Sequence, residues 1–107
     1  MIRWADYEAV ERAVRELAGR IREEHGGVRA IYWYGSWPAG DATPSSDVDL
    51  CIVVEDDDRP ARARSPDYLP TRFPVPLDLT VLTEAEWRRL PERTPSWHRA
   101  ITAGVEL

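Results

Sequence analysis

The sequence contains no lysine, asparagine or glutamine, so all 14 of its basic side chains are arginines. They stand against 19 aspartates and glutamates, which gives a formal net charge of −5 at pH 7. General nucleic-acid binders draw most of their affinity from basic side chains that neutralise backbone phosphates. The acidic balance therefore argues against such a role, and we expect no direct contact with nucleic acid.

Cysteine and long apolar runs are scarce as well. The one cysteine, Cys51, cannot form an internal disulfide, and its place in an apolar run predicts a small buried side chain. No apolar stretch approaches the roughly 18 residues of a membrane span, and the first residues lack the apolar core of a signal peptide. We therefore expect one soluble domain over residues 1–107, located in the cytoplasm.

Two kinds of apolar periodicity divide the chain. Apolar residues between Tyr7 and Ile21 recur at three- and four-residue steps, which predicts an amphipathic helix with Asp6 as its N-cap. Gly26 and Gly27 should follow its end. Runs rich in β-branched, aromatic or other apolar residues predict strands over residues 28–34, 47–54 and 77–82. The helix should then cover one face of a sheet.

Two shorter helices should follow the last strand. Thr83 and Glu86 stand at the spacing of a capping box, which opens a helix through Leu90. Thr94-Pro95 opens another, with the proline in the first turn and Gly104 at the end. Helices and strands thus occur in one chain, as in the α/β class.

Residues 55–76 follow neither period. This segment holds the acidic run Asp56, Asp57 and Asp58 and five of the nine prolines, which predicts a long loop or a poorly ordered insertion. The acidic run has the spacing of a solvated turn rather than of a metal-binding loop. Loops on rigid scaffolds often contact substrates, so the arginines of the segment could meet phosphates (Arg59, Arg62, Arg64 and Arg72).

The residues that suggest chemistry lie where predicted strands end and begin. Gly35 and Ser36 follow the first strand, and ten residues later Asp47 and Asp49 open the second. Residues two apart on a strand point to the same face, so both carboxylates should project toward the Gly-Ser turn. The third strand carries Asp78. Three gathered acids would repel one another without a cation, and carboxylate oxygens are the ligands that Mg²⁺ prefers.

This pattern resembles that of the nucleotidyltransferase (polymerase beta-like) superfamily. In particular, the sequence resembles the minimal nucleotidyltransferases, or MNT domains, that are paired with HEPN-domain proteins in prokaryotic toxin–antitoxin systems. The family pattern is Gly-Ser, ten residues, Asp-x-Asp and a later Asp on a neighbouring strand, and Gly40 and Ser46 match it as well. The resemblance implies an α/β (α+β) fold with a small mixed β-sheet flanked by helices.

The resemblance also implies an activity, in which AMP is transferred from ATP and pyrophosphate is released. Asp47 and Asp49 would bind two Mg²⁺ ions, and Asp78 would ligate the catalytic ion and help to deprotonate the attacking hydroxyl. The nucleotide-binding residues would be Gly35, Ser36 and Ser46, the first two at the β- and γ-phosphates. The acceptor would be a tyrosine of a HEPN toxin, and the chain would act as its antitoxin.

Two positions depart from the family. Many relatives carry arginines where this chain has Trp37 and Ala39. Two alternatives therefore stay open: adenylylation of a small molecule such as an aminoglycoside, and a non-catalytic antitoxin that neutralises its partner by contact. Five tryptophans also exceed what so small a core readily buries. We expect exposed aromatic surface near Trp37 that contacts a partner chain or stacks on the adenine.

Overall fold

The structure, a computed structural model, describes residues 4–107 and places side chains from Asp6 onward. The elements in chain order are α1 (Trp4–Glu24), β1 (Val28–Tyr34), α2 (Ser36–Ala39), β2 (Val48–Val54), α3 (Ala61–Arg64), the 3₁₀ helix η1 (Ser65–Asp67), β3 (Leu77–Thr83), α4 (Glu84–Arg93), α5 (Pro95–Thr102) and β4 (Val105–Glu106). Within the described residues, no helix combines the length and the hydropathy that crossing a membrane requires.

The four strands form one mixed sheet in the order β3-β2-β1-β4. β1 pairs antiparallel with β2 and with β4, whereas β2 and β3 are parallel. Parallel neighbours need a crossover connection, which the segment between β2 and β3 provides. The predicted fold class is therefore confirmed, and the three predicted strands agree with β1, β2 and β3 to within one residue.

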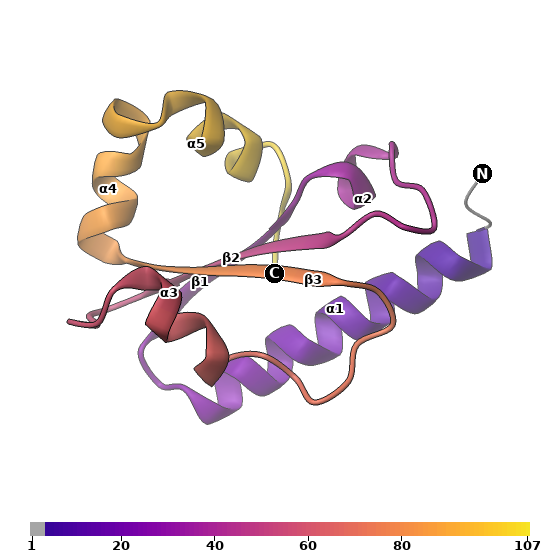
Figure 1. Cartoon of the computed structure of the whole chain (residues 1–107), viewed down its shortest axis with the longest axis horizontal. Helices are drawn as coiled ribbons and strands as arrows, with labels where there is room; N and C mark the ends of the chain where they lie inside the picture. The colour runs from indigo at the N-terminus through magenta and orange to yellow at the C-terminus, as the bar shows by residue number, and fades with distance from the viewer. Residues whose placement is uncertain (1–3) are drawn as a thin grey trace.

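Helix α1 runs along one face of the sheet (Figure 1). Its apolar stripe is buried together with alternate strand residues in one cluster, which includes Val14, Leu17, Ile31, Leu50, Ile52, Leu79 and Val81. The helix begins at Trp4, so Asp6 lies in its first turn and the prediction of Asp6 as N-cap is wrong. A negative charge in the first turn still suits the positive end of the helix dipole.

Helices α4 and α5 lie on the opposite face (Figure 1). The predicted capping box is present, since the Thr83 side chain accepts from the Glu86 N–H while the Glu86 side chain accepts from the Thr83 N–H. Beneath the two helices lies a second buried cluster formed by Cys51, Leu82, Leu90 and Ile101. Cys51 is fully buried, as predicted, and this burial raises the pKa of its thiol to about 12.

The sheet thus has a core on each face, and this accounts for the tryptophans. Trp33 and Trp37 are buried on the α1 side, where the Tyr7 ring lies tilted against both. Trp37 is only 2% exposed, so the prediction of exposed aromatic surface at this residue is wrong. The prediction assumed that the chain has a single core, whereas the sheet has one on each face. Within residues 6–107, the large hydrophobic side chain that is exposed is Leu69, at 47%.

Residues 55–76 do not form one long loop, because α3 and η1 lie within them. A buried arginine holds the segment in place: Arg64 is 4% exposed. Its guanidinium donates to the carbonyl oxygens of Asp57, Arg59 and Val81 at 3.0, 2.8 and 3.1 Å and to the Glu86 carboxylate at 2.6 Å. The loop prediction was wrong here because one cation, rather than an apolar stripe, ties these residues to β3 and α4.

The acidic run is likewise more than a solvated turn. Asp57 accepts hydrogen bonds from the Arg59 backbone and side chain, and these lower the pKa of Asp57 to about 2. Arg59 also pairs with Asp67 at 2.7 Å. These contacts join the start of the segment to η1, so local ion pairs supplement the anchoring by Arg64.

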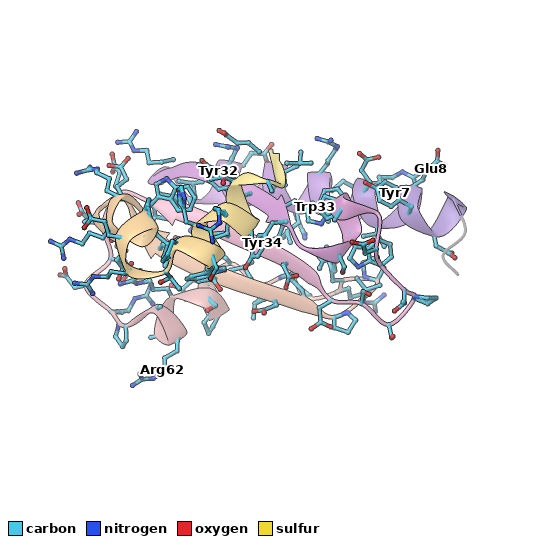
Figure 2. The ribbon with its side chains drawn as sticks, turned by 90° about the horizontal axis from the view of Figure 1, so that it is seen from above. Tyr7, Glu8, Tyr32, Trp33, Tyr34 and Arg62 are labelled. Carbon is cyan, nitrogen blue, oxygen red and sulfur yellow. The ribbon has the colours of Figure 1, made fainter. Side chains whose placement is uncertain are left out.

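We expect Arg64→Ala to lower the free energy of unfolding by about 2–4 kcal/mol, because it leaves three carbonyl groups without their donor and Glu86 without its buried partner. Its matched control is Arg62→Ala. Arg62 lies on the same short helix but extends into solvent (Figure 2), so its loss should cost no more than about 0.5 kcal/mol. Urea denaturation measures both, and equal losses would contradict the role assigned to Arg64.

Candidate active site

The predicted acids lie at one end of the sheet, where β1 ends and β2 and β3 begin. Asp49 pairs directly with Asp78 across the parallel β2–β3 ladder and with Tyr34 across the antiparallel β1–β2 ladder. Asp47 lies one residue before β2. The strand neighbours of Asp49 and Asp78 are buried against α1. Alternation along a strand therefore places both carboxylates on the other face of the sheet, the face that α4 and α5 share.

The three charges influence one another. The pKa of Asp49 is raised above its ordinary value, chiefly because the carboxyl is partly buried, and then because the charges of Asp78 and Asp47 disfavour its ionisation. Asp47 and Asp78 themselves are exposed. A group of like charges placed in this way favours either a proton or a cation among them.

Gly35 is in contact with this group. Its φ of 85° and ψ of −152° lie in a region that only glycine adopts readily. A Cβ atom at this position would come within 2.3 Å of the Asp49 Oδ2 atom. The absence of a side chain therefore lets the backbone turn tightly against the carboxylate. The next residue, Ser36, begins α2.

The chain between α2 and β2 is held by the buried indole of Trp37. The Trp37 Nε1 atom donates to the carbonyl oxygen of Ser46 at 3.0 Å. The Ser46 hydroxyl accepts from the Thr43 N–H at 2.8 Å and so closes a turn. Trp37 and Ser46 thus set the position of Asp47, which follows directly. The nucleotide contact predicted for Ser46 stays a prediction, but its hydroxyl already serves this turn.

Tyr34 is a site residue that the sequence analysis missed. Its hydroxyl accepts from the Trp97 indole of α5 at 3.2 Å. Burial raises the pKa of Tyr34 to about 12, with Asp49 and Asp78 contributing, so the phenol stays protonated. Figure 2 looks onto this side of the molecule. The position of Tyr34 in the sequence could have indicated this role. Tyr34 is the last residue of its strand before Gly35, so in an antiparallel pair it lies opposite the first residues of the next strand.

The donor atoms here fit a hard divalent cation. Within residues 6–107, no three His, Cys, Asp or Glu side chains are arranged as a metal-ligand group as they stand. However, Asp49 and Asp78 are already neighbours in the ladder, and both they and Asp47 offer carboxylate oxygens. Like charges repel when no cation lies between them, so their side chains need not converge in its absence. Asp47, Asp49 and Asp78 are therefore the residues that would hold such an ion.

A pocket of about 430 Å³ adjoins Gly35 and Ser36, between α2 and the end of α5. Its other lining residues are Pro38, Ala39, Asp41, Ala100, Ala103 and Gly104. Most of them are small and apolar, and in the described part of the chain none that lines this pocket is basic. We refer to it as the α2–α5 pocket.

Arg59 and Arg64, two of the four arginines in residues 55–76, do not supply a positive charge to this pocket. Arg59 is held by Asp57 and Asp67, and Arg64 is held by Glu86. For Arg64, which is buried, the prediction of a phosphate contact is wrong, and for Arg59, Arg62 and Arg72 it stays a prediction. Arg59 and Arg64 stabilise the crossover segment, because acidic partners lie close to both of them.

Comparison with known proteins adds to this geometry. The nucleotidyltransferase domain family matches residues 14–99, a range that contains every residue predicted for the site. A solved structure from Sulfolobus solfataricus, described as a candidate nucleotidyltransferase, matches with a TM-score of 0.62 and 20% sequence identity, over 78% of this chain and 75% of that chain. At this identity the likeness concerns the fold alone. A search of curated proteins finds no match.

Replacing Asp49 by asparagine should stabilise the metal-free protein near neutral pH by up to about 1 kcal/mol, the scale of a like-charged cross-strand pair. Because the pKa of Asp49 is raised in the folded state, its ionised form costs stability. The advantage of Asp49→Asn should therefore be full above that raised pKa and fade as the pH falls toward the ordinary value of 3.8. Urea denaturation in EDTA as a function of pH measures this difference.

The control for Asp49→Asn is Asp56→Asn, which removes an exposed acid beyond the other end of β2. Mg²⁺ should stabilise the wild type and the control variant but not Asp49→Asn, since binding to the folded state alone raises stability. An Asp49→Asn protein that is less stable than the wild type in EDTA at neutral pH would contradict the electrostatic argument.

Gly35→Ala should abolish stabilisation by Mg²⁺, because the new methyl group displaces the Asp49 carboxylate. Gly40→Ala is the matched control: Gly40 also has a φ of 85°, but a Cβ atom there meets nothing within 4 Å. Both variants should lose about 1 kcal/mol or more of stability from backbone strain. Thermal denaturation with and without Mg²⁺ separates them, and a normal Mg²⁺ response in Gly35→Ala would count against the contact.

Proposed function

This chain belongs to the nucleotidyltransferase domain family, and from that membership we propose that it transfers AMP from ATP to a hydroxyl group of a partner protein. The observation that carries the proposal is the direct pairing of Asp49 with Asp78 beside Gly35. A chain folded only as a scaffold has no need to keep two like charges opposite each other, since such a pair destabilises a sheet.

The proposed roles follow from the chemistry of the side chains. Asp47, Asp49 and Asp78 would hold two Mg²⁺ ions, which neutralise charge on the phosphates and polarise the reacting phosphoryl group. The backbone at Gly35 can approach a phosphate closely because no Cβ atom intervenes, and Ser36 offers an N–H and a hydroxyl donor. These two residues would bind the β- and γ-phosphates, with Ser46 at the edge of the nucleotide site.

The reaction can be written with every bond accounted for. The acceptor hydroxyl oxygen forms a bond to the α-phosphorus of ATP, and the bond between that phosphorus and the bridging oxygen of the β-phosphate breaks. Pyrophosphate leaves with the bonding electrons, and the hydroxyl proton passes to the Asp78 carboxylate. Asp78 suits this role because it is exposed on the face where an acceptor would enter. The products are an adenylylated acceptor and pyrophosphate.

The acceptor we propose is a tyrosine of a HEPN-domain toxin, so that the chain acts as an antitoxin. The motif supports a macromolecular acceptor, and the exposure of the acids is compatible with one. The motif from Gly35 to Asp49 resembles that of MNT antitoxins, and the exposure of both Asp47 and Asp78 leaves the acidic end of the site open to a protein side chain. The same exposure would admit a small-molecule acceptor such as an aminoglycoside.

The proposal predicts that ATP labelled at its α-phosphate, incubated with Mg²⁺ and the product of the neighbouring gene, will label that product. The double variant Asp47→Asn, Asp49→Asn should lower labelling at least about 100-fold, because it removes charges that stabilise the transition state. The double variant Asp56→Asn, Asp58→Asn has the same acidic spacing in the crossover segment and should label as well as the wild type.

Each other outcome points to a different function. Pyrophosphate release with a small hydroxyl compound but no labelled protein would identify a small-molecule acceptor. Full neutralisation of the partner by the Asp47→Asn, Asp49→Asn variant would identify a non-catalytic antitoxin. Labelling by that variant at the wild-type level would reject the assignment of the site.

A further inference from the structure

The α2–α5 pocket lies beside the residues proposed to hold phosphate, yet its charge is unsuited to an anion. Asp41 is the charged residue among those that line it, and the remaining lining residues are neutral. Its volume of about 430 Å³ lies in the range of about 300–1,000 Å³ that ligand sites occupy. A phosphate bound at Gly35 and Ser36 would therefore face a roomy cavity that offers it no cation.

The lack of a cation in this pocket matters because the groups proposed around it are negatively charged, an argument that rests on the proposed function. The acids on β2 and β3 would hold their Mg²⁺ ions on one side of the triphosphate. Asp41 lies close to Ser36, because its N–H donates to the Ser36 carbonyl oxygen at 2.9 Å, so its carboxylate would repel phosphate oxygens bound there unless a positive charge lay between them. Ser36, the proposed phosphate ligand, and Asp41 thus both line a pocket whose remaining walls are neutral.

No arginine of the described chain lines the α2–α5 pocket. Arg59 and Arg64 are engaged in the crossover segment. Arg99 belongs to α5, one turn before Ala103, but it is exposed and is not among the residues that line the pocket. The sequence contains no lysine at all. Within residues 6–107, no basic side chain lines the pocket, which leaves room there for a cation from another molecule.

We propose that a partner protein inserts an arginine side chain into the α2–α5 pocket. The aliphatic part of the arginine lies against Pro38, Ala39 and Ala100, and its guanidinium donates to Asp41 and to the phosphate oxygens. Arginine suits this lining, because its stem covers apolar surface while its planar head makes paired hydrogen bonds to carboxylates and phosphates. The partner thereby completes the nucleotide site, and Mg·ATP binds weakly until the partner is present.

The chain alone provides a direct test through Ala39→Arg, which places an arginine in the pocket from its own wall. This variant should bind Mg·ATP at least about tenfold more tightly than the wild type, the effect expected of one hydrogen bond to a charged group. Ala61→Arg, an exposed change on α3, is the control and should bind like the wild type. Millimolar ethylguanidinium should likewise tighten binding by the wild type but not by Ala39→Arg.

The complex provides the complementary test. In the complex with the neighbouring gene product, one arginine-to-alanine change in the partner should weaken Mg·ATP binding at least about tenfold, and Ala39→Arg should restore it. Asp41→Asn should reduce the effect of ethylguanidinium. These measurements use nucleotide affinity, so they do not depend on which acceptor is modified.

Three results would overturn the proposal. Binding by Ala39→Arg that is no tighter than by Ala61→Arg means that the pocket does not face the phosphates. A tenfold loss of affinity in Arg99→Ala alone means that the chain supplies its own cation. Equal stimulation of wild type and Ala39→Arg by ethylguanidinium means a nonspecific effect. If the partner is labelled but Ala39→Arg binds Mg·ATP no more tightly than the wild type, only the proposal for the pocket is rejected. If Ala39→Arg binds Mg·ATP more tightly but the partner is not labelled, only the proposed acceptor is rejected.

Discussion

The register between β2 and β3 is the constraint on which the candidate site depends. Leu50 and Leu79 are paired across this ladder and buried against α1, and the preceding pair, Asp49 and Asp78, therefore lies on the opposite face. A slip of one residue in either strand would carry a carboxylate into the apolar core. Hydrophobic burial on one face thus supplies the free energy that holds two like charges together on the other.

Two separate cores position the parts of the site around these acids. On the α1 side, buried Trp37 anchors α2 and, through the Ser46 carbonyl group, the segment that precedes Asp47. On the other side, Trp97 of α5 donates to Tyr34, the strand residue opposite Asp49. The site therefore lies at the boundary of two packed layers, and a disturbance of either core reaches it.

The sequence predicted what local spacing determines. The alternation in the strands, the capping box at Thr83 and the acids at the strand ends all depend on residues close together in the chain, and each lies in its predicted element or one residue outside it. The buried position of Trp37 and the anchoring by Arg64 were not predictable in this way. Arg64 binds backbone at Asp57 and Val81, so its role appears only after β3 is placed. Periodicity carries no information on such contacts.

The use of arginine in this chain connects stability with the site. Because lysine is absent, every fixed positive side-chain charge is an arginine, and its planar head makes several directed hydrogen bonds at once. Arg64 uses that property to satisfy three carbonyl groups and a carboxylate at the far end of the sheet. The end that carries Asp47, Asp49 and Asp78 instead keeps its carboxylates without a described arginine partner. Partial burial, and then the charges of Asp78 and Asp47, raise the pKa of Asp49 there. Repulsion among these carboxylates lowers the stability of the folded state, and burial in the two cores compensates for it. A bound cation would reduce the repulsion directly.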